Sequence, residues 1–519
     1  MSIVVVLSIA GCDSAFDFFG LKDKASDSIA EETVASRMLD ELMISLTGVT
    51  GRGMLARSVI FQNEAVTLRT ALETELSQAN IDSNSNVNTI AETLVIGMSD
   101  YISQSPTLIA ANPGEILAVA GSSLIQAGTK DENIGALATG TTTNNFIAST
   151  ASLLMEKAVA IDPSAAGPNV ALVMQKVAEA TIASEGVGDS SADIGIVLGG
   201  VVDAVVATIS ASYDEALTAN VGGGLVAGII AREDNTLVNT IGQAVMAAAT
   251  PIMSPAVVQE TMSACVTSIM QGTNAVNAGT FVEGLVAAVV SDCLTLNKPE
   301  LVTNIGIGTA EAATVSSDAP MATAVLSGCI AAISDNADVG TIGTAMQGIM
   351  TIVETAQDTG STIGAELGNA VTSAVSTQIE GEYTLSALAH DNPIYMAWSP
   401  NLQIFSDSLP SLMTRLYIGP DTLEGTQNAH DEIPAGDGIA SIEQRVVQNN
   451  RIYMLIHWTQ HPDPYSQDKW ETLELLTYDS GNALFLASDL FVDRADAEAL
   501  LGTDMTETAI VAFNLHRIP

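Results

Sequence analysis

Residues 83–382 form a long stretch of small side chains, and this stretch constrains the fold more than any other part of the chain. Ala, Gly, Val, Ile, Ser and Thr dominate it, and between residues 102 and 382 only Phe146, Tyr213 and Phe281 are aromatic. A core formed in this region is therefore built from small aliphatic side chains.

The apolar residues of this stretch recur with a helical period. After Thr341 they follow at i+1, i+4, i+5, i+8, i+9 and i+12, which places them on one face of an α-helix. These residues are Ile342, Ala345, Met346, Ile349, Met350 and Val353.

A short motif, a polar residue followed by Ile and Gly, recurs along the same stretch. It occurs at 133–135, 193–195, 240–242, 304–306, 341–343 and 362–364, with a near match at 220–222. Most spacings lie near multiples of about 20 residues, the length of one helix of about four turns and its connection.

These patterns predict a helix that begins at each motif. The polar residue is expected to be the N-cap, and the glycine to let a neighbouring helix approach closely. A unit of this size cannot bury its apolar face alone, so neighbouring units must stack. The sequence therefore predicts a mainly α protein: an Ala/Gly-rich helical repeat array, either an α-solenoid or a layered bundle with a unit of about 20 residues, followed by a smaller α+β domain. An irregular Ala-rich bundle is the alternative.

The composition changes near residue 383. All three tryptophans and all five histidines lie beyond it. Residues 451–458, 470–478 and 509–516 are rich in β-branched and aromatic residues, as strands are, and 494–502 is expected to be a short helix. We predict a signal peptide at 1–11, a tether at 12–31, an N-terminal helical segment at 32–82, the repeat region at 83–382 and the α+β domain at 383–519.

The N-terminal residues carry a second signal. An apolar run, Ile3 to Ala10, is too short to span a bilayer and is typical of a secretory signal. The ending Ile9-Ala10-Gly11-Cys12 resembles the lipobox of bacterial lipoproteins, although no Lys or Arg precedes the run. The resemblance implies export, cleavage before Cys12, lipid attachment to that cysteine and a place in the cell envelope.

The net charge of the chain limits the kinds of partner that it can bind. The chain has 17 Lys plus Arg against 60 Asp plus Glu, a net charge of −43. Such a field repels nucleic acid and favours cations or a basic or cell-envelope protein partner; a saline habitat is another explanation. No cofactor is predicted, although a divalent cation is compatible with the acidic surface. The oligomeric state stays open.

Candidate site residues lie in the C-terminal domain. His457 and His461 have the i, i+4 spacing of a helical metal pair, with Asp463 nearby; because the pair spans a strand end and a Pro-rich loop, a polar loop is the alternative. Trp458 and Tyr465 are candidate binding residues, because exposed aromatic side chains commonly anchor interfaces. The loops at 419–438 and 459–469 are the expected contact surfaces.

Two further sequence patterns are expected to have no catalytic or metal-binding role. His390-Asp391 and His430-Asp431 lack a nucleophile signature and are expected to be solvated. The alternation of Asp82, Asn84, Asn86 and Asn88 resembles the start of a calcium loop but lacks its glycine, so a capped helix start is expected there.

Together these features favour a non-enzymatic, lipid-anchored surface protein whose helical array presents a C-terminal module for binding or assembly. Two alternatives remain open. One is a hydrolase or metal-dependent enzyme in residues 383–519. The other is a membrane-inserting or pore-forming protein, because residues 235–259 and 261–282 are free of charge and long enough to span a bilayer, although their individual apolar stretches are shorter than a bilayer needs.

Overall fold

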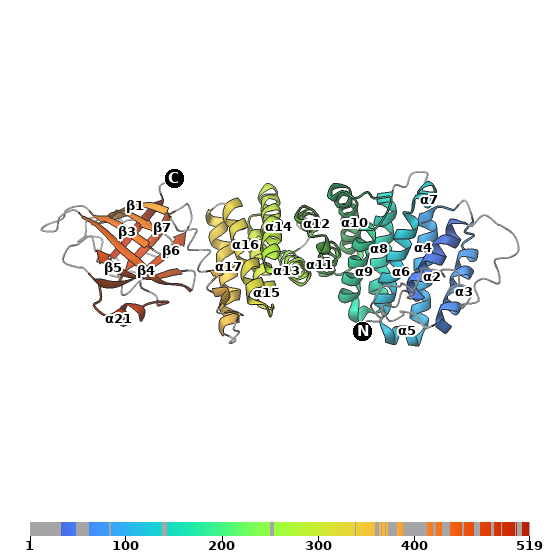
Figure 1. The fold of residues 1–519 in the computed structure, drawn as a ribbon, viewed down its shortest axis with the longest axis horizontal. Coiled ribbons are helices and arrows are strands. Elements are labelled where there is room, and N and C mark those ends of the chain that lie inside the picture. Colours follow the sequence, from blue (N-terminus) through green and yellow to red (C-terminus); the bar gives the residue numbers. More distant parts are fainter. Residues whose placement is uncertain are drawn as a thin grey trace, which may run out of the picture.

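Two structural units follow one another along the chain, an array of α-helices and a closed β-barrel (Figure 1). The computed structural model describes residues 33–47, 62–82, 85–137, 143–249, 254–337, 339–358, 363–364, 366–368, 370–371, 381–387, 413–418, 422–427, 436–448, 451–460, 468–478, 482–488, 490–503, 505 and 511–517.

The helices of the array stack in two layers, and from residue 87 onward successive helices of a layer are joined through a helix of the other layer. The first layer consists of α3 (Gln62–Gln78), α4 (Val87–Gln104), α8 (Thr143–Ile161), α10 (Ser191–Ser212), α12 (Asn235–Ala249), α14 (Ala275–Thr295) and α16 (Ala319–Asn336). The second consists of α2 (Val34–Thr47), α6 (Pro113–Gly128), α9 (Ala166–Ile182), α11 (Leu217–Ile229), α13 (Pro255–Gly272), α15 (Glu300–Thr314) and α17 (Val339–Asp358). The prediction of a helical array is confirmed, and it has the two-layer form of an α-solenoid.

Short helices join or extend these elements. They are α5 (Pro106–Ala111), α7 (Asp131–Ile134) and the 3₁₀ helices η1 (Gly135–Leu137), η2 (Pro163–Ala165) and η3 (Ile230–Arg232). The helices α2 and α3, from the segment predicted as a separate N-terminal part, pack against α6 and α4 and so belong to the array.

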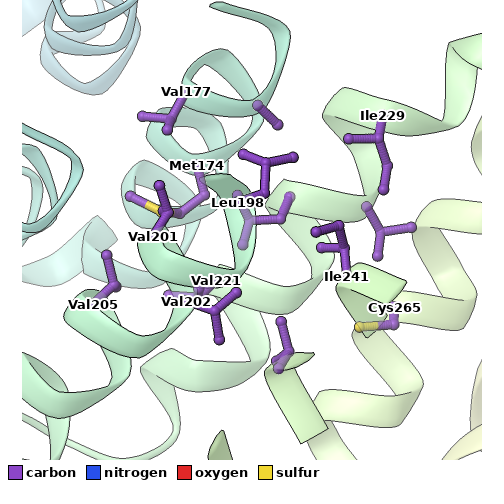
Figure 2. Close-up of a cluster of buried hydrophobic side chains, with 14 of the residues drawn as sticks. Met174, Val177, Leu198, Val201, Val202, Val205, Val221, Ile229, Ile241 and Cys265 are labelled. Carbon is purple, nitrogen blue, oxygen red and sulfur yellow. The ribbon is translucent and has the colours of Figure 1, made fainter. Parts of the chain in front are cut away.

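The core of the array lies between its two layers. Figure 2 shows side chains from both layers pointing toward one another: Met174, Val177, Leu198, Val201, Val202, Val205, Val221, Ile229, Ile241 and Cys265. Each of them is almost completely buried. Burying a Val, Leu, Ile or Met side chain contributes about 1.5–3 kcal/mol, so the stability of the array comes from this seam of small side chains.

Helices begin earlier than the recurring Ile-Gly motif predicts. From α8 to α17, successive helices start 18 to 26 residues apart, close to the expected unit. The expected N-cap role of the motif is wrong, however. Ser190 caps α10 by accepting a hydrogen bond from the backbone N–H of Asp193, the motif's polar residue, while Thr240 and Asn304 lie within the second turns of their helices. The motif therefore marks positions inside helices and does not mark their starts.

The expected role of the motif glycine in close helix packing is confirmed at Gly242 but not at Gly135, where a Cβ atom would meet nothing within 4 Å. A Cβ atom on Gly242 of α12 would lie 2.3 Å from Cδ1 of Leu285 in α14. One on Gly224 of α11 would lie 2.2 Å from the backbone oxygen of Ala171 in α9. Helices of one layer thus approach each other as closely as backbone atoms allow, which explains the glycine content of the array.

The C-terminal unit is an eight-stranded antiparallel barrel in which each strand pairs with its chain neighbours and the last strand pairs with the first. Its strands are β1 (Gly381–Ala387), β2 (Met413–Ile418), β3 (Thr422–Gln427), β4 (Gly436–Gln448), β5 (Arg451–Gln460), β6 (Lys469–Tyr478), β7 (Asn482–Ala487) and β8 (Val511–Arg517). A short helix, α21 (Arg494–Glu498), packs against β6. The barrel lies beyond α17, at the end of the array (Figure 1).

Three of the strands and the short helix match the predicted elements at 451–458, 470–478, 509–516 and 494–502. The expectation of a single loop at 419–438 is wrong, because β3 and the start of β4 lie inside it. Their sequences contain glycine and charged residues, but they pair with each other and with their other neighbours through backbone hydrogen bonds. A closed ladder can include such residues, since backbone groups make the pairing.

Candidate functional site

His457, one of the predicted metal ligands, lies on strand β5. Its Nε2 atom is 2.8 Å from Oδ1 of Asp468, and its ring stacks on that of Trp470, with centroids 4.2 Å apart and planes inclined by 9°. The other two proposed ligands, His461 and Asp463, lie outside the described residues. Within the described residues no group of three or more His, Cys, Asp or Glu side chains is arranged to hold a metal ion. The metal site at these residues remains a prediction.

Trp470 forms the centre of a stack on the outer face of the barrel. The guanidinium carbon of Arg494, from α21, lies 5.4 Å from the centroid of its ring, and Arg494 also pairs with Glu498 at 3.4 Å. The backbone of Trp470 exchanges two hydrogen bonds with Phe491, of 2.8 and 2.7 Å. These contacts fasten α21 and the segment before it to β6, which is a structural role.

Trp458, predicted as an exposed binding residue, is fully buried at 0% exposure. Its indole Nε1 donates a 2.6 Å hydrogen bond to Oε2 of Glu471, which is itself 7% exposed. The expectation of an exposed contact is wrong because Trp458 shares the inward face of β5 with Ile452 and Ile456. Tyr465, the other aromatic candidate, lies outside the described residues.

The second layer of the array carries a feature that sequence reasoning missed, an open groove over α9, α11, α13 and α15. Its volume is about 560 Å³, within the range of about 300–1,000 Å³ typical of ligand sites. Its floor consists of small residues, Ala171, Ala219, Gly223, Gly224, Ala227 and Ala264. Of these, Ala219, Gly223 and Ala227 are spaced four residues apart on α11 and lie on one face of that helix.

The floor of the groove is formed where α11 packs closely against its neighbouring helices. The hydroxyl of Ser268 on α13 donates a 2.8 Å hydrogen bond to the backbone oxygen of Gly223 on α11. A Cβ atom on Gly223 would lie 3.2 Å from Cβ of Ala264. With α9 close on its other side, α11 sits between two neighbours at backbone distance, and its outer face carries no large side chain that could fill the groove.

Polar side chains form the walls of the groove. Glu311 of α15 accepts a 2.7 Å hydrogen bond from Nε2 of Gln259 on α13, and Glu260 on α13 is exposed. In the part of the chain that the structure describes, neither carboxylate lies within ion-pair distance of a lysine or arginine. Nearby Glu179, by contrast, pairs with Lys176. The groove therefore presents two uncompensated carboxylates above an apolar floor.

Several other predicted features can be placed. Asn86 caps α4 by accepting a 2.8 Å hydrogen bond from the backbone N–H of Asn88, so the expected capped helix start is confirmed. Cys12, His390-Asp391 and His430-Asp431 lie outside the described residues.

Two helices, α10 and α14, are long and apolar enough to cross a membrane by length and composition. Half of the most apolar window of each is buried within the array. Asp203 and Glu283 lie on their exposed faces. Core helices of a soluble array have this same composition, so the two helices are weak support for membrane insertion.

Comparison of the chain with models of known protein families, with curated proteins and with solved structures gave no match.

Proposed function

We propose that this protein is an exported, lipid-anchored binding scaffold of the cell envelope, in which the helical array receives a partner and presents the barrel at its far end. The observation that carries the proposal is the open groove on the second layer of the array. Stacked helical repeats commonly use such extended surfaces for protein recognition. The buried seam between the layers supports this role, because it holds the exposed faces rigid.

The membrane anchor is the part of the proposal that rests on sequence alone. Export would remove residues 1–11, and the lipid on Cys12 would hold the array at a membrane surface. A single acyl chain gives only marginal membrane binding, so stable anchoring needs the two or three chains of a mature lipoprotein.

The anchor is tested by mass spectrometry of the mature N-terminus after expression in a bacterial host. We expect a diacylated or triacylated Cys12 and recovery of the protein in the membrane fraction. The Cys12→Ser variant is expected to lose both the lipid and the membrane association. An unmodified Met1 on the native protein would contradict the anchor but leave the scaffold role untouched.

Binding by the array is tested with a random peptide library panned against the full chain. Selected peptides should bind with a Kd below about 100 µM and slow hydrogen exchange in α9, α11 or α13. Peptides that protect only the barrel strands would move the binding function to the barrel. A library that yields no peptide of this affinity would contradict a scaffold that binds extended segments.

A further inference from the structure

We propose that the groove over α9, α11, α13 and α15 binds an extended peptide segment that carries lysine or arginine side chains, supplied by a partner protein. This inference rests on the proposed scaffold function and names its partner class. It is carried by the shape of the groove, by the placement of its carboxylates and by the charge of the surrounding array.

The shape favours a peptide backbone lying on the floor. Ala219, Gly223 and Ala227 line the groove from one face of α11, and only Ala227 is partly exposed. This face carries no side chain larger than a methyl group, so a ligand backbone can lie close to the helix. The lining of the groove offers hydrogen-bonding groups to that backbone, among them the side chains of Gln271 on α13 and Asn220 on α11. Extended peptides need such groups, because their backbone N–H and C=O have no internal partners.

The carboxylates favour basic side chains. Glu260 and Glu311 project from neighbouring helices, α13 and α15, and both line the same groove. The bond from Gln259 holds Glu311 in place, so one of the two charges is already oriented before a ligand arrives. A preoriented carboxylate loses less side-chain entropy when it pairs with a cation.

The surroundings strengthen this selectivity. Between residues 131 and 414 the only cationic residues are Lys157, Lys176, Arg232 and Lys298. Of these, Lys176 is already paired with Glu179. A basic segment is therefore attracted over a long distance, and an acidic one is repelled, in a salt-dependent manner.

The test is fluorescence anisotropy of the full chain with three labelled nonapeptides of the same length, in which alternate positions carry lysine, glutamate or serine. The lysine peptide should bind most tightly, and its affinity should fall as salt rises. In the Glu260→Gln/Glu311→Gln variant its affinity should fall about tenfold. In the matched control, Asp203→Asn/Glu283→Gln, which removes the same charge from exposed positions of the first layer, the change should be less than twofold.

A second variant tests the groove independently of charge. Ala227→Trp places a large side chain on the floor, and it should abolish lysine-peptide binding while hydrogen exchange in α11 shows that the helix is still formed. If Ala227→Trp unfolds α11, Ala227→Leu is the replacement.

Three results would overturn the inference even if the lysine peptide binds. An equal loss in the control variant would mean diffuse attraction. Binding of the serine peptide as tight as that of the lysine peptide would remove the role of the carboxylates. Displacement of the lysine peptide by equimolar spermine would indicate a site for small free cations. If library-selected peptides protect another face of the array while the lysine peptide fails to bind, the scaffold function stands and only this inference falls. If neither binds, both fall.

Discussion

Replacing Gly224 by alanine tests whether backbone contact between helices holds the array together. The new Cβ would lie 2.2 Å from the backbone oxygen of Ala171 and 2.9 Å from Cβ of Met174, whereas such contacts in proteins are not shorter than about 3.0 Å. Because the first obstacle is a backbone atom of α9, no side-chain rotation relieves it. The two helices would have to separate by roughly 0.8 Å, and a gap of this size forfeits about a quarter to a half of the dispersion energy of the contacts it opens.

The expected cost follows from two opposing terms. Overpacking a close-packed site costs about 1–3 kcal/mol, and the better helix propensity of alanine returns about 1 kcal/mol. Since the clash is with the backbone, the cost should lie near the upper limit, and we expect a net loss of about 2 kcal/mol. The matched control is Gly200→Ala in α10, where a Cβ would meet no atom within 4 Å. There the propensity term acts alone, and we expect a gain of about 0.5–1 kcal/mol.

Hydrogen exchange followed by mass spectrometry separates the two variants, because stability in a repeat array is local and a single melting temperature does not report it. Exchange in α9 and α11 should become faster in Gly224→Ala, while exchange in α10 should slow in Gly200→Ala. Unchanged or slower exchange in α9 and α11 of the Gly224 variant would refute the view that the glycine is needed for their contact.

Three further predictions concern single side chains. Asn86→Ala removes the cap of α4 and should cost about 1 kcal/mol, seen as faster exchange in its first turn. Trp458→Phe removes the indole donor to the buried Glu471 and should destabilise the barrel by about 1–3 kcal/mol, measured by urea denaturation. Burial raises the pKa of the Cys265 and Cys329 thiols to about 12 and, with nearby Asp292 and Glu300 adding to it, that of Cys293 to about 11. All three should resist a thiol reagent at pH 8 until urea unfolds the array. Since the unfolded thiols ionise first, the free energy of unfolding should fall as pH rises from about 9 towards 12.

The sequence predicts the helices of the array well because their apolar positions recur with the helical period. The order of helices in the layers is harder to predict. Gly224 of α11 packs against Ala171 of α9, the helix that precedes α11 in the second layer. Nothing in the local period selects that partner over α10, the helix that precedes α11 in the chain. The N-cap of α10 could have been predicted from the sequence, because Ser190 stands three residues before Asp193, a spacing typical of helix starts.

The strands of the barrel also differ in whether local sequence or long-range pairing determines them. Strand β5 could be predicted from its β-branched and aromatic residues, and its alternation also places Trp458 on the same face as Ile452, Met454 and Ile456. This alternation predicts that the side chain of Trp458 points into the barrel. Strand β3 could not be predicted, because its residues, TLEGTQ, form a strand through pairing with β2 and β4. The groove also depends on long-range packing, since its lining residues come from four separate helices.

The two-layer stack also has a mechanical consequence. The helices of the array contact only near neighbours along the chain, and the helices in its middle are seen nearly end-on where those at both ends are seen from the side (Figure 1). Tension applied between the two ends can therefore be taken up as many small changes of angle between successive helix pairs, each of which leaves the buried seam intact. If Cys12 carries a lipid, as proposed above, such an array would act as a spring between the membrane and whatever holds the barrel, lengthening under load and recoiling when the load is removed.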